Sequence, residues 1–141
     1  LRLATKSSDG KANLHQGAIG VGLDLATGKA VQAVQQERIV THHPDTGVAL
    51  SEISIPEWDT LLRLASQSYE VTELGYLGCD IVLDKSQGPL ILELNARPGL
   101  SIQIANNHGL LPRLKHLRDM KTRKMVMEDR VQYAKEVLAN I

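Results

Sequence analysis

The sequence predicts an α+β domain in which an antiparallel sheet is flanked by helices. Three observations lead to this prediction. Residues 75–100 hold two aliphatic segments joined by a polar turn, which indicates a β-hairpin. Residues 17–25 alternate between apolar and small or polar side chains, which is typical of a half-buried strand. Residues 58–69 repeat apolar side chains at helical spacing, which indicates an amphipathic helix.

Length and composition limit the classes of protein to consider. The 141 residues are enough for one domain, residues 1–141, with a core of its own. The 16 basic and 16 acidic residues balance, so charge gives no indication of nucleic-acid or membrane binding. No apolar run approaches the roughly 20 residues that span a bilayer. The single cysteine, Cys79, excludes an internal disulfide and fits a reducing compartment, so we predict a cytoplasmic location.

The first part of the chain reads as short strands and turns. Gly20 and Gly22 leave one face of the second strand open, as expected where a backbone or a ligand approaches closely. Residues 36–47 are polar and irregular. His42 and His43 there are more typical of a solvated loop than of a metal site, because nothing nearby completes a zinc set. Strands are expected at residues 2–5, 17–25 and 30–35.

A helix follows the strands. Ser54 can cap its start and Pro56 suits its first turn, while Gly75 stops it near Glu73. Both aromatic residues of its apolar stripe are interpreted as core rather than as a platform for a nucleotide base. The stripe consists of Trp58, Leu61, Leu62, Ala65 and Tyr69.

The hairpin brings acidic side chains together. With its centre in the polar turn at residues 84–89, Asp80 lies directly opposite Glu93. Opposite residues of an antiparallel pair point to the same face with Cβ atoms about 5 Å apart. Asn95 falls on that face as well, because side chains alternate with period two. Two carboxylates and an amide therefore converge.

The same register defines the other face of the hairpin. The hairpin is taken to be centred between Ser86 and Gln87, which places Val82 opposite Ile91. Cys79 on the other face is expected to be buried, free and inert, since a thiol among aliphatic side chains behaves as a small hydrophobe. This core face carries Leu77, Cys79, Ile81, Leu83, Leu90, Leu92 and Leu94.

Opposed carboxylates call for an explanation, because like charges directly opposite each other destabilise a sheet. A cation between them, or a raised pKa, removes the repulsion. Ligands that are all oxygens select Mg²⁺, Mn²⁺ or Ca²⁺, and few protein ligands with room for water and phosphate suit Mg²⁺ best. An ordinary hairpin with a polar solvent side accounts for the spacing equally well.

The C-terminal part predicts helices. They are expected at residues 101–107, 111–118 and 127–139, and residues from about 111 to 141 form a helical C-terminal extension. Basic residues gather from the second of these helices into the segment before the third. We interpret the cluster as an exposed linker, with phosphate contact as the alternative. It comprises Lys115, Arg118, Lys121, Arg123 and Lys124.

Two segments carry a family resemblance. Asp80, with the later run Leu-Glu-Leu-Asn-Ala-Arg-Pro-Gly at 92–99, resembles the metal-binding end of the ATP-grasp superfamily. The run Lys-Ala-Asn-Leu-His-Gln-Gly-Ala at 11–18 is similar to the ribosomal-protein glutamate ligase branch, and closer to α-L-glutamate ligase-like, sugar-transfer-associated ATP-grasp proteins. The resemblance covers most of residues 1–110. It implies the C-terminal lobe of an ATP-grasp fold, with a missing N-terminal lobe of the same protein that supplies the adenine pocket.

The resemblance also implies cofactors and their ligands. The family holds ATP with two Mg²⁺ ions, for which Mn²⁺ can substitute. Asp80 would bind one ion, Glu93 would bridge both, and Asn95 would complete the second.

Further residues match positions of the family that handle phosphate and substrate. Arg2 matches the arginine that meets the transferred phosphoryl group or the acyl phosphate, and Asn13 matches an asparagine near phosphate and metal, so both are expected to be catalytic. Lys11 stands where the glutamate ligases usually have arginine. Arg97 would meet the donor or acceptor carboxylate. Each of three residues also has a purely structural alternative. Arg2 would be a surface arginine, Asn13 a turn residue, and Arg97 a brace for the turn that follows it.

The implied activity is carboxylate–amine ligation through an acyl phosphate. Its partners would be ATP, a carboxylate donor and an amine acceptor. The acceptor would be an amino acid, a peptide or a sugar-linked amine. The isolated fragment is expected to be inactive. The alternative is a non-catalytic module derived from ATP-grasp that binds nucleotide or metal or serves in assembly. A third interpretation is an α+β domain stabilised by Ca²⁺ or Mg²⁺ without a nucleotide.

Overall fold

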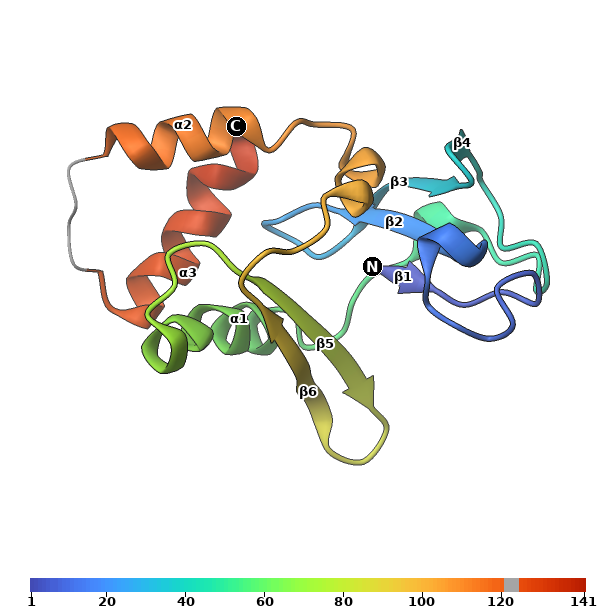
Figure 1. The fold of residues 1–141 in the computed structure, drawn as a ribbon, viewed down its shortest axis with the longest axis horizontal. Coiled ribbons are helices and arrows are strands. Elements are labelled where there is room, and N and C mark those ends of the chain that lie inside the picture. Colours follow the sequence, from blue (N-terminus) through green and yellow to red (C-terminus); the bar gives the residue numbers. More distant parts are fainter. Residues whose placement is uncertain (121–124) are drawn as a thin grey trace.

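The computed structural model of the protein describes residues 1–120 and 125–141 (Figure 1). It has the predicted α+β fold, with antiparallel sheets and flanking helices. The strands are β1 (Arg2–Leu3), β2 (Ile19–Leu23), β3 (Ala30–Gln35), β4 (Arg38–Ile39), β5 (Gly78–Asp84) and β6 (Gly88–Asn95). The α-helices are α1 (Trp58–Thr72), α2 (Leu111–Asp119) and α3 (Met127–Glu136). Short 3₁₀ helices are η1 (Leu14–Gln16), η2 (Leu50–Glu52), η3 (Ser101–Asn106) and η4 (Leu138–Asn140).

The first four strands form one sheet in the order β1-β2-β3-β4, with antiparallel neighbours. Its buried cluster contains Ile19 and Val21 of β2, Ala33 of β3 and Leu50 of η2. Ile19 and Val21 lie on the face that the alternation in the sequence predicts. The strand β4 lies within the segment predicted to be irregular, so that prediction is wrong for Arg38–Ile39, which pair with the end of β3.

The other face of β2, which carries Gly20 and Gly22, is covered by η3, so β2 is buried on both faces and the prediction of a half-buried strand is wrong. A Cβ atom at Gly22 would lie 2.1 Å from the carbonyl oxygen of Ala105, and one at Gly20 would lie 3.1 Å from the side chain of Ile102. Ala105 is fully buried there. The prediction that these glycines admit a close backbone is confirmed, and the backbone is that of η3, which lies beside β2 in Figure 1.

The start of α1 differs from its prediction. The residue before the helix is Glu57, which adopts a left-handed conformation with φ 52° and makes no side-chain capping bond. Ser54 instead forms a short antiparallel bridge with Lys29, so the predicted cap is wrong. The helix ends at Thr72, and Glu73 itself adopts the left-handed conformation, with φ 56°. The predicted end is therefore correct, although Glu73 and not Gly75 makes the turn.

The two aromatic residues of α1 have different surroundings. Trp58 is half-buried, and its indole N–H donates to the carbonyl of Leu25 at 2.9 Å. Its ring also packs on Gly28, where a Cβ would lie 2.7 Å from the indole. Tyr69 is 45% exposed and its ring lies 5.3 Å below the guanidinium of Arg130. The core assignment is thus sound for Trp58 and wrong for Tyr69.

The loop of the β5–β6 hairpin is centred on Ser86, because Asp84 pairs with Gly88. The predicted centre between Ser86 and Gln87 is therefore wrong by half a residue. Val82 accordingly pairs with Leu90, so Leu90 lies on the face of Val82 and its assignment to the core face is wrong. The predicted partner Ile91 pairs with Ile81 instead.

A β-bulge then shifts the register of the hairpin. Ile81 pairs with Ile91 and Asp80 pairs with Glu93, so Leu92 is the extra residue on β6. The bulge restores the predicted Asp80–Glu93 pair. Leu92 is 66% exposed, which removes it from the predicted core face.

Cys79 is free but only half-buried, with its Sγ 3.7 Å from the hydroxyl of Ser68, so the prediction of a buried thiol is wrong.

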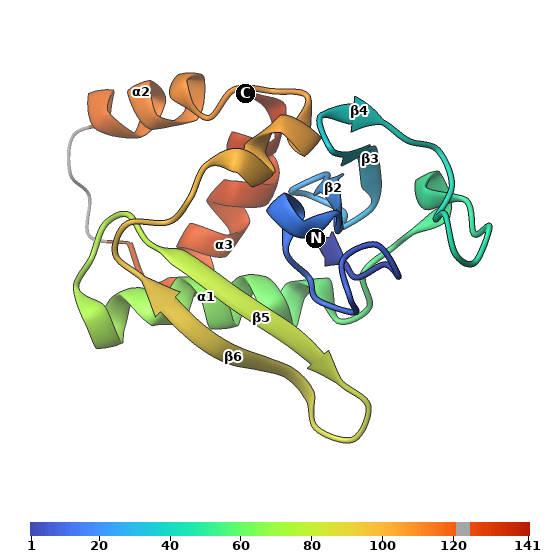
Figure 2. The same ribbon diagram turned by 45° about the vertical axis from the view of Figure 1, so that its right-hand side comes forward.

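The distal half of the hairpin is exposed on both faces. Both views show the hairpin lying across α1 and extending beyond it (Figures 1 and 2). The exposed aliphatic side chains are Val82, Leu83, Ile91 and Leu92.

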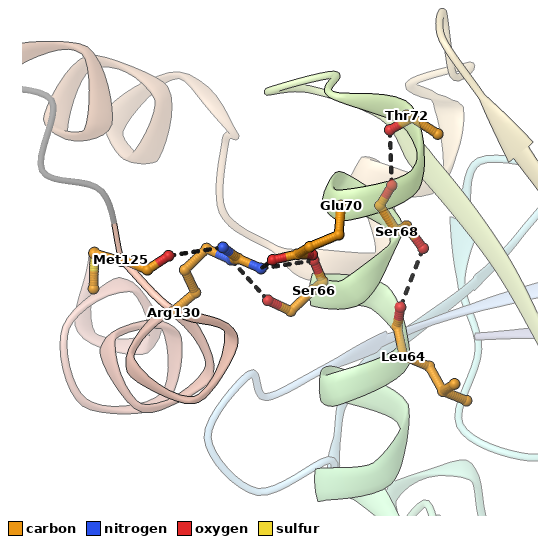
Figure 3. Close-up of polar contacts among 7 residues, drawn as sticks. All are labelled: Leu64, Ser66, Ser68, Glu70, Thr72, Met125 and Arg130. Atoms are coloured by element: carbon orange, nitrogen blue, oxygen red, sulfur yellow. Dashed lines mark hydrogen bonds and ion pairs between the residues drawn. The ribbon is translucent and has the colours of Figure 1, made fainter.

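Of the C-terminal helices, α3 packs on α1, and α2 contacts α3 and η4. Arg130 of α3 binds Ser66 through the Ser66 hydroxyl at 2.9 Å and the Ser66 carbonyl at 3.1 Å, and it pairs with Glu70 (Figure 3). Lys135 pairs with Asp59 at 2.6 Å.

The basic cluster predicted near α2 is described in part. Lys115 and Arg118 are exposed on α2, and Lys121, Arg123 and Lys124 lie outside the described residues.

Candidate functional site

Arg2 and Asp80 form an ion pair between β1 and β5. Arg2 pairs with Gly20 of β2, so it lies on the glycine-bearing face of the sheet. Its Nη2 is 2.6 Å from Asp80 Oδ2, and the side chains are 41% and 35% exposed. Arg2 is therefore aimed at the hairpin and meets the first acidic residue of the predicted set.

Glu93 and Asn95 extend the same cluster. Glu93 lies directly opposite Asp80, and Asn95 lies opposite Gly78, one period further along the ladder. The Asn95 Nδ2 donates to Glu93 Oε1 at 2.6 Å. The shared face that the sequence predicts for Asp80, Glu93 and Asn95 is thus present, and Arg2 joins it.

The donor set of this cluster fits a hard cation. Asp80 and Glu93 supply carboxylate oxygens on adjacent strands and Asn95 supplies an amide oxygen, with Glu93 exposed to incoming ligands. The described part of the chain holds no group of three or more His, Cys, Asp or Glu side chains arranged around one point. A metal here would complete its shell with water and phosphate oxygens, which Mg²⁺ accepts.

Lys11 and Asn13 lie on a separate loop. The Lys11 Nζ is 3.5 Å from Asp9 Oδ2, both well exposed. The Asn13 side chain accepts from the His15 N–H at 3.0 Å and so caps η1. The described contacts of these residues do not link them to Asp80 or Glu93.

The base of that loop is held by residues that sequence reasoning missed. Thr5 Oγ1 and Gln35 Nε2 both donate to the carbonyl of Gly17, at 2.9 and 2.7 Å. Ser8 is buried and its hydroxyl donates to the carbonyl of Thr5 at 3.0 Å. A glutamine at the end of a largely apolar strand is the one signal for this network. It fixes where the loop bearing Lys11 and Asn13 leaves the sheet.

Arg97 follows β6 and is exposed. Its side chain takes part in none of the ion pairs or side-chain hydrogen bonds found within residues 1–120 and 125–141. The neighbouring Pro98 packs closely on Gly78, where a Cβ would lie 2.6 Å from the proline ring. This contact sets the direction in which the chain leaves the site.

Two hollows among the described residues lie away from the acidic cluster. A hollow of about 270 Å³ lies at the start of α1, between Thr27, Trp58 and Lys135. A second hollow of about 270 Å³ lies along β3 and β4. Neither is lined by Asp80 or Glu93, and the chemistry of the acidic face is the better guide to function.

Comparison with protein families identifies a match whose extent includes the whole cluster. The model of the family described as sugar-transfer associated ATP-grasp matches residues 1–119, from β1 to the end of α2. Comparison with curated proteins and with solved structures gives no match. Among the described residues, no helix has the length and apolar character needed to cross a membrane.

Proposed function

This chain belongs to the sugar-transfer associated ATP-grasp family, and we propose that it is the metal- and phosphate-binding lobe of a ligase that joins a carboxylate to an amine. Membership indicates an ATP-dependent ligase-type fold in general. The observation that carries the finer proposal is the meeting of Arg2, Asp80, Glu93 and Asn95 on one face. The lobe would span residues 1–141, with residues from about 111 onward as a helical extension.

The proposed reaction has two steps. The γ-phosphoryl group of ATP passes to the donor carboxylate, and the amine then displaces phosphate from the acyl phosphate. Such chemistry depends mainly on positioning and on neutralising charge. When bound, two Mg²⁺ ions would neutralise the phosphate oxygens. Asp80, Glu93 and Asn95 would hold these ions.

The basic residues would act on phosphate and substrate. Arg2 presents a guanidinium that suits two oxygens of one phosphoryl group, because its N–H donors form a planar fork. Lys11 and Asn13, on the loop held at the Gly17 carbonyl, would contact the phosphates of ATP. Arg97 is exposed beside the cluster and would bind the carboxylate of the donor or the acceptor.

The test is release of ADP from Mg·ATP by the full-length protein that carries both lobes, with a panel of amino-acid, peptide and amino-sugar acceptors. Glu93→Gln should lower turnover by on the order of a hundredfold, the scale seen when one preorganised electrostatic group is lost. Glu52→Gln, an exposed carboxylate on η2, is the matched control and should keep normal turnover. The melting temperature of Glu93→Gln should equal or exceed that of the wild type, because the substitution relieves repulsion with Asp80.

Two outcomes would contradict the proposal. Equal turnover in Glu93→Gln and wild type would remove Glu93 from the mechanism. Tight binding of Mg·ATP without ADP release for any acceptor would favour the non-catalytic nucleotide-binding module.

A further inference from the structure

Each carboxylate of the candidate site already accepts a hydrogen bond from the chain itself. Arg2 donates to Asp80 and Asn95 donates to Glu93, both at 2.6 Å. We propose that Arg2 is an internal counter-ion, which holds Asp80 until a divalent cation displaces it and frees its guanidinium for phosphate. This inference rests on the proposed metal site and adds an order of events to it.

The placement of Arg2 supports this role. Arg2 belongs to the four-stranded sheet, and Asp80 belongs to the separate two-stranded hairpin. Among the described residues, their ion pair is the polar side-chain contact that joins these two sheets. The pair therefore links two independently built elements at the candidate site, and it screens the repulsion between Asp80 and Glu93.

The exposure of the pair makes it exchangeable. Both side chains are more than a third exposed, and an ion pair in such surroundings changes an equilibrium by only a few-fold. A dication on Asp80 would be repelled by a guanidinium bound to the same carboxylate, so the two compete. The displaced Arg2 would lie beside the metal, where phosphate oxygens offer a bidentate partner.

Asn95 would make a parallel exchange. Its Nδ2 now faces Glu93, which leaves the amide oriented as a donor toward the carboxylate. Half a turn of the amide group would present Oδ1 to a cation instead. Arg2 and Asn95 would thus both turn from carboxylate donors into supports of the bound metal and phosphate.

The proposal predicts opposite effects of one substitution on two ligands. In Arg2→Gln the affinity for Mn²⁺ alone, measured from the free Mn²⁺ signal in electron paramagnetic resonance, should rise about three- to tenfold. The affinity for Mn·ATP should fall about tenfold, because a charge-assisted phosphate contact is lost. Arg38→Gln, which removes an exposed charge on β4, should change neither affinity. Arg2→Lys should retain part of the competition with Mn²⁺ while losing the bidentate contact.

A second substitution separates this proposal from the proposed function. Asp80→Asn should weaken Mn²⁺ binding, and in that background Arg2→Gln should no longer increase it. If Asp80→Asn weakens Mn²⁺ binding while Arg2→Gln leaves it unchanged or weakens it, the counter-ion role is wrong and the metal site stands. If neither wild type nor Arg2→Gln binds Mn²⁺, or if Asp80→Asn has no effect, both the metal site and the counter-ion role are wrong.

Discussion

The four-stranded sheet and the β5–β6 hairpin are built differently, although both are antiparallel. The sheet contains side chains that are 0–8% exposed, among them Ile19, Val21 and Val34. The hairpin has none this buried, and its distal half exposes Val82 and Leu92. Folding energy therefore concentrates in the sheet, and the hairpin depends on its own ladder and on α1 for support.

The candidate site lies across this boundary. Arg2 comes from the well-packed sheet, and Asp80, Glu93 and Asn95 come from the exposed hairpin. Since the acids contribute little to the core, substitutions among them should affect ligand binding much more than stability. The comparison thus separates residues that maintain the fold from residues available for chemistry.

A matched pair of side-chain truncations tests the contrast between the sheet and the hairpin most directly. Ile19→Ala should lower the free energy of unfolding by about 3–4 kcal/mol, because Ile19 is fully buried and its removal leaves a cavity. Ile91→Ala should cost about 1 kcal/mol or less, since Ile91 is 37% exposed. Urea denaturation of both variants measures the difference, and equal losses would show that the hairpin is as tightly packed as the sheet.

Loss of the contact between α3 and α1, the helix that supports the hairpin, should have a smaller effect on the free energy of unfolding. Arg130→Gln should cost about 1–2 kcal/mol, because Arg130 donates to Ser66, Glu70 and the carbonyl of Met125 and stacks on Tyr69. Arg118→Gln is the control. It removes an arginine whose only ion pair within the described residues, with a neighbouring carboxylate, is highly exposed, and it should change stability by less than about 0.5 kcal/mol. Similar melting temperatures for the two variants would contradict the anchoring of α3 on α1.

The smallest effect is expected at the tip of the hairpin. The hydroxyl and the backbone N–H of Ser86, with the N–H of Gln87, hold the pKa of Asp84 below its ordinary value of 3.8. Because the folded state binds this proton less readily than the unfolded chain, the contribution to stability is present above pH 3.8 and is lost as the pH falls through the lowered pKa. Carbon-13 resonance of the carboxyl group should report this pKa, and Ser86→Ala should raise it toward the ordinary value. An unchanged pKa in Ser86→Ala would refute the assignment.

Sequence patterns predicted the elements that depend on local periodicity. The alternation around Ile19 and Val21 gave a strand with the correct buried face, and the helical stripe from Trp58 gave α1. The pairing of Asp80 with Glu93 was also correct, but through two compensating departures. The loop is centred on Ser86, and the bulge at Leu92 shifts the ladder back. A bulge depends on packing and strand twist, which alternation alone does not record.

Other features depend on contacts between distant segments, and these were not predictable. Arg38–Ile39 form a strand because they lie against β3, not because of their own propensity. Ser54 does not cap α1, since it bridges Lys29 instead. The ion pair of Arg2 with Asp80 likewise arises from the approach of two sheets, although the hairpin register had identified Asp80 and the family resemblance had identified Arg2.

The close packing of Ala105 on Gly22 has a consequence for the order in which the chain folds. The two residues are far apart along the chain, and α1 and the hairpin come between them. The sheet and the hairpin can each form from local contacts, whereas we expect η3 to dock on β2 and β3 later, because closing a long loop costs entropy before its contacts are gained. The chain just after Asn95 leads directly into η3, so this late docking step would also be the step that brings the acidic face to its final orientation.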